Sequence, residues 1–373
     1  MMSTFLAAPL PLLAHPGLAT PRQACLTSQA ARLSFNRSGS TGIRAQAELS
    51  RENAEGDLRT DWRELPVMHV IESQQFSPYS LDYIFKRADK MEHVRPGSPE
   101  AKELDGRIMS TLFYEPSTRT RLSFESAMTR LGGQVLSTEN AGSFSSAAKG
   151  ETLEDTMRTI QCYADVIVLR HFQAGSARKS AAAASVPIIN AGDGPGQHPT
   201  QALLDMYTIQ RELGHLENIR IGLVGDLANG RTARSLAFLL SMYKGIKMYF
   251  VAPDVVRMKD DIKSFFRSRN VDYEEVDDLA EVASDVDVLY QTRIQKERFQ
   301  DRPEDYDLAK GKYIIDNETL KILPKNSIIM HPLPRVDEIK TEVDADPRAA
   351  YFRQAKNGLY VRMALLSLQF EGR

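Results

Sequence analysis

The sequence predicts an α/β protein with two doubly wound parallel-sheet domains that are joined by helices. The first reason is that, from about residue 78, short apolar runs alternate with segments of helical period, as they do in βαβ units. The second is that 373 residues are enough for two domains of ordinary size. Seven apolar runs are strand candidates and suit two small sheets: 108–113, 166–169, 187–189, 219–224, 247–251, 286–290 and 328–330.

The helix expected at 117–132 is an example of the segments between the strands. Phe124, Ala127, Met128 and Leu131 recur at the spacing i, i+3, i+4, i+7, which gives this helix one apolar face. A pair of glycines follows and ends the helix. We therefore expect the apolar face to be buried.

Domain boundaries follow from later breaks in the pattern. The periodic stretch 198–214 ends at a glycine and a new strand-turn-helix pattern begins at 219, so the boundary falls at 213–218. A last helix at roughly 347–369 begins after an Asp-Pro pair and is long enough to reach back to the first domain. These signals predict a first domain at 65–212 that also includes the C-terminal segment 350–373, and a second domain at 213–349.

Composition argues against several classes of function. The formal net charge is −2, from 47 basic and 49 acidic residues, so no global basic field exists to bind nucleic acid or an acidic membrane surface. No segment is apolar over a length that spans a bilayer. The two cysteines, Cys25 and Cys162, do not form a CxxC motif, so a disulfide framework or a structural zinc site is not expected.

The N-terminal segment 1–47 differs from the rest of the chain. It contains no Asp, Glu or Lys, is rich in Ser, Thr and Ala, and carries arginines at 22, 32, 37 and 44. This composition is typical of an organelle transit peptide. A plain disordered tail is the alternative interpretation.

The motif FYEPSTRTR at 113–121 stands where a strand ends and a helix begins. Ser117 is a suitable N-cap, so the free N–H groups of the first turn point outward beside the Ser117, Thr118 and Thr120 hydroxyls and the Arg119 guanidinium. A helix N-terminus with added donors and a cation binds phosphate. The alternative is an ordinary capped helix with solvated arginines.

Two further segments at strand ends carry candidate polar residues. Arg170 and His171 follow the run 166–169, although such a pair is more often part of a solvated loop. The glycine-rich segment 190–201 leads into a helix with His198 at its cap and Gln201 three residues later. The positive helix end would keep His198 neutral, as suits a donor to a carbonyl oxygen, or His198 merely caps the helix.

The segment GDLANGRT at 225–232 matches a nucleotide phosphate loop except that Arg231 replaces the lysine. The planar fork of an arginine suits a carboxylate, whereas the loop lysine is a flexible point charge. We therefore interpret Arg231 as a carboxylate clamp, and a P-loop nucleotide-binding protein remains the rival. Strand alternation places Arg293 and Gln295 on one side after another strand, which predicts a second clamp.

Two loops complete the set of candidates. In HPLPR at 331–335, two prolines stiffen the loop and could direct a backbone carbonyl at a substrate amine, although for this motif by itself a structural turn is the better interpretation. The polar loop 143–151 carries Lys149 and is either a ligand-closing loop or a solvated connector. Together these sites describe a pocket for a phosphorylated small molecule and a dicarboxylate.

In this order, six motifs make residues from about 65 to 370 resemble the catalytic chains of the aspartate carbamoyltransferases: FYEPSTRTR, LRH, GDGPGQHPTQ, GDLANGRT, TRIQKER and MHPLPR. The leader makes the chain similar to the plant members, which implies a plastid location. The resemblance also implies that the first domain binds carbamoyl phosphate and the second binds aspartate.

The resemblance implies a role for each matching residue. The phosphate group would be held by Ser117, Thr118, Arg119 and Thr120, the carbonyl oxygen by Thr120, Arg170 and His198, and the carbamoyl amide by Gln201. The aspartate α-carboxylate would bind Arg231, its β-carboxylate Arg293 and Gln295, and its amine the carbonyls of Leu333 and Pro334. Glu115 would orient Arg231 and Arg298.

Assembly, cofactors and regulation also follow from the resemblance. Ser145 and Lys149 would reach the neighbouring subunit's pocket, so the active form would be a homotrimer with shared sites that needs no metal or cofactor. The plant-like leader suggests inhibition by UMP at the same residues: Ser117, Thr118, Arg119, Thr120, Arg170, His198, Gln201, Arg231 and Arg293.

Two alternatives remain open. Ornithine carbamoyltransferases share the phosphate motif but carry a cysteine in an HCLP segment, where this chain has Pro332. Pro332, together with Arg293 and Gln295 as a second carboxylate site, favours aspartate. A non-catalytic anion-binding scaffold is the other alternative, and in that case replacing Arg119 by alanine would leave every activity unchanged.

Overall fold

A computed structural model describes residues 69–144, 150–296, 299 and 303–371. These residues belong to one compact unit, Asp61–Arg373. The predicted transit peptide at 1–47 lies outside the described residues.

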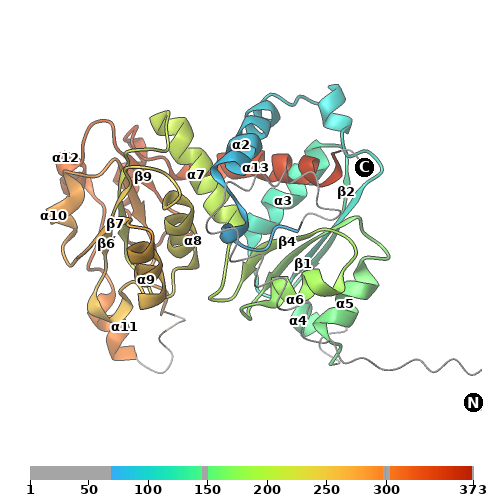
Figure 1. Cartoon of the computed structure of the whole chain (residues 1–373), viewed down its shortest axis with the longest axis horizontal. Helices are drawn as coiled ribbons and strands as arrows, with labels where there is room; N and C mark the ends of the chain where they lie inside the picture. The colour runs from blue at the N-terminus through green and yellow to red at the C-terminus, as the bar shows by residue number, and fades with distance from the viewer. Residues whose placement is uncertain (1–68, 145–149, 297–298, 300–302, 372–373) are drawn as a thin grey trace, which may run out of the picture. The chain divides into compact units, whose positions relative to one another are not determined.

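Two all-parallel sheets carry the fold (Figure 1). The first has the strand order β2-β1-β3-β4 and the second the order β7-β6-β5-β8-β9. The strands of the first sheet are β1 (Ile108–Phe113), β2 (Gln134–Glu139), β3 (Val166–His171) and β4 (Ile188–Asp193). Those of the second are β5 (Arg220–Val224), β6 (Lys247–Val251), β7 (Asp272–Val276), β8 (Val288–Gln291) and β9 (Ile328–Met330).

Helices connect successive strands, as parallel pairing requires. In the half of the chain that contains the first sheet they are α2 (Pro78–Glu92), α3 (Thr118–Arg130), α4 (Ala141–Phe144), α5 (Leu153–Ile160), α6 (Ser176–Ala183) and α7 (Pro199–Leu213). In the other half they are α8 (Arg231–Leu240), α9 (Asp260–Ser268), α10 (Leu279–Ala283), α11 (Pro303–Ala309) and α12 (Asn317–Ile322). The final helix is α13 (Tyr351–Phe370).

All seven apolar runs overlap strands, which confirms the predicted α/β class, but two strands were missed. β2 and β7 each lie at one edge of their sheet, and most of their side chains are exposed or half-buried. These two edges are open to solvent, whereas the edge strands β4 and β9 are buried. A solvated edge strand needs few apolar residues, so neither β2 nor β7 shows up as an apolar run. The buried strands β3 and β4 extend beyond the predicted runs, to His171 and Asp193.

The predicted buried face of α3 is present, since Phe124, Ala127, Met128 and Leu131 are all fully buried. The last helix begins at Tyr351, later than predicted, because the chain before it pairs with β9. Ile329 N donates to Arg348 O at 2.8 Å and Ala350 N donates to Ile329 O at 2.8 Å. From there α13 packs against α2, α3 and α7.

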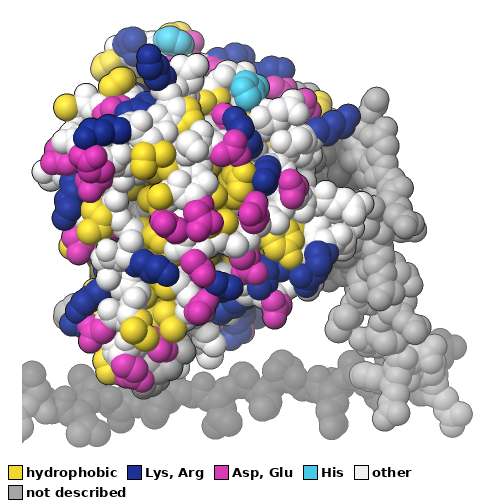
Figure 2. Space-filling view, turned by 90° about the vertical axis from the view of Figure 1, so that its left-hand side faces the viewer, with side chains coloured by type: hydrophobic (Ala, Val, Ile, Leu, Met, Phe, Trp, Pro, Cys, Tyr) yellow, Lys and Arg dark blue, Asp and Glu magenta, His cyan; other side chains and the backbone are white. Residues whose placement is uncertain are grey.

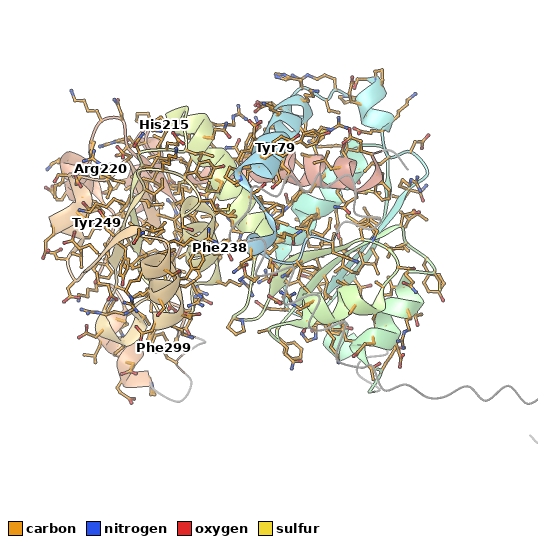
Figure 3. All side chains as sticks on the ribbon, viewed as in Figure 1. Tyr79, His215, Arg220, Phe238, Tyr249 and Phe299 are labelled. Atoms are coloured by element: carbon orange, nitrogen blue, oxygen red, sulfur yellow. The ribbon has the colours of Figure 1, made fainter. Side chains whose placement is uncertain are left out.

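Side-chain packing around the second sheet is aromatic on one side. Phe238 on α8, labelled in Figure 3, stacks on Phe265 of α9 with ring centroids 4.9 Å apart.

Figure 2 shows that acidic and basic side chains are interspersed over the outer face of this half. No helix in the described ranges is both long enough and apolar enough to cross a membrane.

Candidate active site

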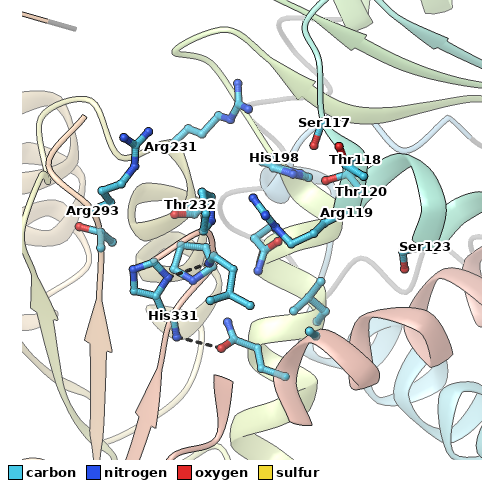
Figure 4. A pocket seen from close by; sticks show the side chains of 18 of the residues that line it. Ser117, Thr118, Arg119, Thr120, Ser123, His198, Arg231, Thr232, Arg293 and His331 are labelled. Atoms are coloured by element: carbon cyan, nitrogen blue, oxygen red, sulfur yellow. Dashed lines mark hydrogen bonds between the residues drawn. The ribbon is translucent and has the colours of Figure 1, made fainter. Parts of the chain in front are cut away.

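A cavity of about 700 Å³ lies where strands of both sheets end at their carboxyl termini, which is the usual ligand position in parallel sheets. Figure 4 shows Arg231 and Arg293 on one side of it and the first turn of α3 on the other. It is lined by these twelve predicted residues: Ser117, Thr118, Arg119, Thr120, Arg170, His198, Gln201, Arg231, Arg293, Gln295, Leu333 and Pro334. The predicted Ser145, Lys149 and Arg298 lie outside the described residues.

The N-terminus of α3 forms one end of the cavity. Strand β1 pairs with β3 so that Phe113 lies opposite Arg170, and Tyr114 N donates to Arg170 O at 2.8 Å. Ser117 occupies the N-cap position but makes no side-chain capping bond, which departs from the expectation that it caps the helix. Its hydroxyl therefore faces the cavity together with first-turn N–H donors, an arrangement that suits a phosphate.

Glu115 organises the arginines of the cavity. Its Oε1 accepts from Arg170 Nη2 at 2.8 Å and lies 3.7 Å from Arg231 Nη2. Arg170 Nη1 also donates to Ala191 O at 3.1 Å, and Arg231 Nη1 donates to Gly194 O at 2.5 Å. The two guanidinium groups are thereby held in fixed orientations, that of Arg170 against β4 and that of Arg231 against the loop after it.

Gly192 makes this arrangement possible. Its φ is +117°, and a Cβ there would lie 2.9 Å from Arg231 Nη2 and 3.1 Å from Arg170 Nη1. Any side chain at this position would displace a guanidinium in addition to straining the backbone.

The contacts of Arg231 disfavour the nucleotide-loop alternative. A phosphate-loop lysine lies over its own loop, whereas Arg231 extends to Gly194 in the loop after β4. The loop 225–232 is held by a bond within itself that does not involve Arg231, since Asn229 N donates to Asp226 Oδ1 at 3.0 Å.

His198 is neutral, although the main physical reason differs from the predicted helix end. Its pKa is well below the ordinary value because the ring is buried, and because the guanidinium groups of Arg231, Arg170 and Arg362 disfavour a second positive charge. Its Nδ1 atom is buried and has no hydrogen-bond partner among the described residues. A neutral imidazole in this position can donate one hydrogen bond to a ligand oxygen.

Positive charge dominates the lining. Among the residues that the structure describes, five arginines and one carboxylate, Glu115, line the cavity. Burial lowers the pKa of Arg119, and the neighbouring Arg170 and Arg293 lower it further. Such an excess of positive over negative side chains favours a ligand with several negative charges.

The loop after β9 completes the wall. His331 Nδ1 accepts from Leu333 N at 2.7 Å, which requires His331 Nε2 to carry the proton and donate to Glu338 Oε1 at 2.7 Å. Gln354 Oε1 accepts from His331 N at 2.9 Å (Figure 4). The buried side chains of Glu338 and Gln354 therefore hold the loop, and Leu333 and Pro334 at its tip line the cavity.

Sequence reasoning missed three residues beside this pocket. Arg362, on α13, lines the cavity and donates to Ser123 Oγ at 2.8 Å. Gln354, earlier on the same helix, also lines the cavity, and its amide donates to Asp205 of α7, which lies behind the cavity wall. Each is one of several polar residues on its helix, and helical period alone gives no reason to select it from the others.

None of the described residues forms a group of three or more His, Cys, Asp or Glu side chains that could hold a metal ion. The described cysteine, Cys162, is exposed.

Comparison with known proteins identifies both halves of the chain. Residues 68–211 match the family model "Aspartate/ornithine carbamoyltransferase, carbamoyl-P binding domain", and residues 217–369 match "Aspartate/ornithine carbamoyltransferase, Asp/Orn binding domain". The chain is 64% identical over 309 residues to a rice protein named chloroplastic aspartate carbamoyltransferase, with 82% of this chain and 85% of the rice protein covered.

Two other comparisons agree. The Arabidopsis protein of the same name is 57% identical over 348 residues, which cover 93% of this chain and 89% of that protein. The structure of aspartate transcarbamoylase from Trypanosoma cruzi in complex with carbamoyl phosphate and aspartate matches with a TM-score of 0.75 and 42% identity. That match covers 80% of this chain and 95% of the other.

Proposed function

The chain belongs to the aspartate/ornithine carbamoyltransferase family, and we propose that it transfers the carbamoyl group of carbamoyl phosphate to L-aspartate in pyrimidine synthesis. The observation that carries the choice of substrates is the distribution of charge in the cavity. The α3 terminus with Arg119 faces Arg231 and Arg293 across it. A phosphate at one side and a dicarboxylate at the other satisfy this arrangement.

The proposed reaction is an attack by the deprotonated amine of aspartate on the carbamoyl carbon. Thr120, Arg170 and His198 would stabilise the oxyanion that forms. Arg170 is already held by Ala191 O and Glu115, and His198 is already neutral. Preorganised donors of this kind are worth roughly 10²–10³ in rate each. The C–O bond to phosphate then breaks, and the leaving phosphate takes the proton that the amine nitrogen gives up, with its remaining charge balanced by Arg119 and the α3 N–H groups.

We propose that Arg231 binds the α-carboxylate of aspartate and that Arg293 and Gln295 bind its β-carboxylate. Leu333 and Pro334 would accept from the amine through their carbonyl oxygens. Ornithine, with an extended cation in place of the β-carboxylate, would meet Arg293 and be repelled.

Two finer parts of the proposal concern assembly and regulation. The described pocket lacks a lysine, and Lys149 and Ser145 of a neighbouring copy would add a cation and a hydroxyl in a homotrimer. UMP would compete with carbamoyl phosphate by placing its phosphate at the α3 terminus. A plastid location is supported by the acid-free leader and by the chloroplastic names of the plant relatives.

The test is formation of carbamoyl aspartate by purified residues 48–373, with ornithine as the control acceptor. Product with aspartate and none with ornithine supports the proposal, and the reverse result refutes it. Mixing Lys149→Ala with Arg119→Ala subunits tests the shared site, because only hybrid trimers would regain activity. An unchanged rate at high UMP would refute the regulatory part.

A further inference from the structure

A buried carboxyl group lies directly behind the cavity. Asp205, on α7, is fully buried. Its Oδ1 accepts from Gln201 Nε2 at 2.8 Å and from Gln354 Nε2 at 2.7 Å, while its Oδ2 accepts from Tyr290 OH at 2.7 Å. One side chain thus joins α7, α13 and β8.

These contacts fix the orientation of two amide groups. An amide that turns its NH₂ toward Oδ1 must turn its carbonyl oxygen away from it. For Gln354 this oxygen accepts from His331 N. Gln201 lines the cavity, and no donor from the described part of the chain reaches its Oε1. The cavity wall therefore carries an acceptor that a ligand N–H can satisfy.

We propose that Asp205 is a positioning residue that turns Gln201 Oε1 toward the carbamoyl NH₂ group and thereby selects carbamoyl phosphate over acyl phosphates without an N–H donor. This inference rests on the proposed function. Acetyl phosphate is the closest such competitor, because it differs only by a methyl group in place of the NH₂. If the amide of Gln201 were reversed, two donors would face each other and the carbamoyl group would lose its distinguishing hydrogen bond.

The interaction does not depend on the charge of Asp205. Burial raises the pKa of this carboxyl to about 7, against the opposing effect of its hydrogen bonds and of Arg362. A proton on Asp205 would reside on Oδ2, which faces the Tyr290 hydroxyl, and Oδ1 would still accept from both amides. Asparagine can reproduce this protonated state, with its oxygen toward the two glutamines and its NH₂ toward Tyr290.

The experiment compares Asp205→Leu, which has no acceptor, with Asp205→Asn in the full-length protein. Carbamoyl aspartate formation gives KM for carbamoyl phosphate, and competition gives Ki for acetyl phosphate. We expect Asp205→Leu to lower the ratio of Ki to KM by roughly 10- to 100-fold, the usual loss for one hydrogen bond to a buried group. Asp205→Asn should restore the parent ratio. Tyr290→Phe, which removes only the bond to Oδ2, is the matched control and should leave the ratio unchanged.

Three results would overturn the inference: an unchanged ratio in folded Asp205→Leu, an equal loss in Asp205→Asn, or an equal loss in Tyr290→Phe. If Asp205→Leu does not fold, Asp205→Ser takes its place, since a serine hydroxyl is too short to reach both amides. A purely structural lesion would weaken the binding of both phosphates alike and leave the ratio intact. Failure of the proposed function is distinguishable, because then the parent protein itself would form no carbamoyl aspartate.

Discussion

Replacing Asp205 by asparagine should stabilise the protein in a manner that depends on pH. Asp205 is fully buried, and its pKa is raised from 3.8 to about 7, chiefly by burial. Between these values the folded state holds a proton that the unfolded state has released. Protonated Asp205 therefore contributes its full stability to the folded parent below about pH 4, and this contribution is lost as the pH rises through about 7. The advantage of asparagine over aspartate grows as the parent loses it.

The size of the effect follows from the two pKa values. The interval between 3.8 and about 7 corresponds to about 4 kcal/mol when the loss is complete. Of this, about 3 kcal/mol is lost between about pH 5 and pH 8.5. Because Asp205→Asn has no ionisable group at this position, its advantage over the parent should grow by this amount over the same interval.

Urea unfolding at fixed protein concentration, at both pH values, measures the difference in unfolding free energy between parent and variant. Common effects of other titrating groups cancel in this comparison. Tyr290→Phe should enlarge the loss of unfolding free energy over this pH interval, because the Tyr290 hydrogen bond lowers the pKa of Asp205 and its removal would raise that pKa further. A parent-variant difference that is the same at both pH values would show that Asp205 has no raised pKa and refute the reasoning.

Three further outcomes are expected. Arg231→Lys should lower kcat/KM for aspartate by roughly 30-fold with little change in KM for carbamoyl phosphate. The reason is that an ammonium group lacks the fork with which the guanidinium bonds Gly194 O and a carboxylate at once. Equal effects on both substrates would contradict this. Gly192→Ala should raise KM for aspartate and lower the melting temperature by a few degrees, since the strained φ costs ~1–2 kcal/mol, and an unaltered melting curve would argue against it. His198 should show the nitrogen NMR shifts of a neutral ring from about pH 6 to 9, and a titration in that range would contradict the lowered pKa.

Much of the fold could be predicted because the core strands are continuous apolar runs. β1, β6 and β9 occupy the predicted residues, and the apolar face of α3 is buried as its period indicates. The edge strands β2 and β7 could not be found, because their exposed side chains carry no apolar signal. The start of α13 was also placed too early, since pairing of residues 348–350 with β9 is a long-range contact that local period does not encode.

The sequence by itself determined which residues can hold anions, because motifs at the ends of strands are brought to one edge of a parallel sheet by the fold class alone. Arg119, Arg170 and Arg231 could be selected on that basis. Only the tertiary structure decided how they are oriented and charged. Glu115 joins Arg170 to Arg231, and Asp205 joins Gln201 to Gln354 of a helix 149 residues later. Burial and hydrogen bonding depend on neighbours distant in sequence, so no local pattern could have predicted them.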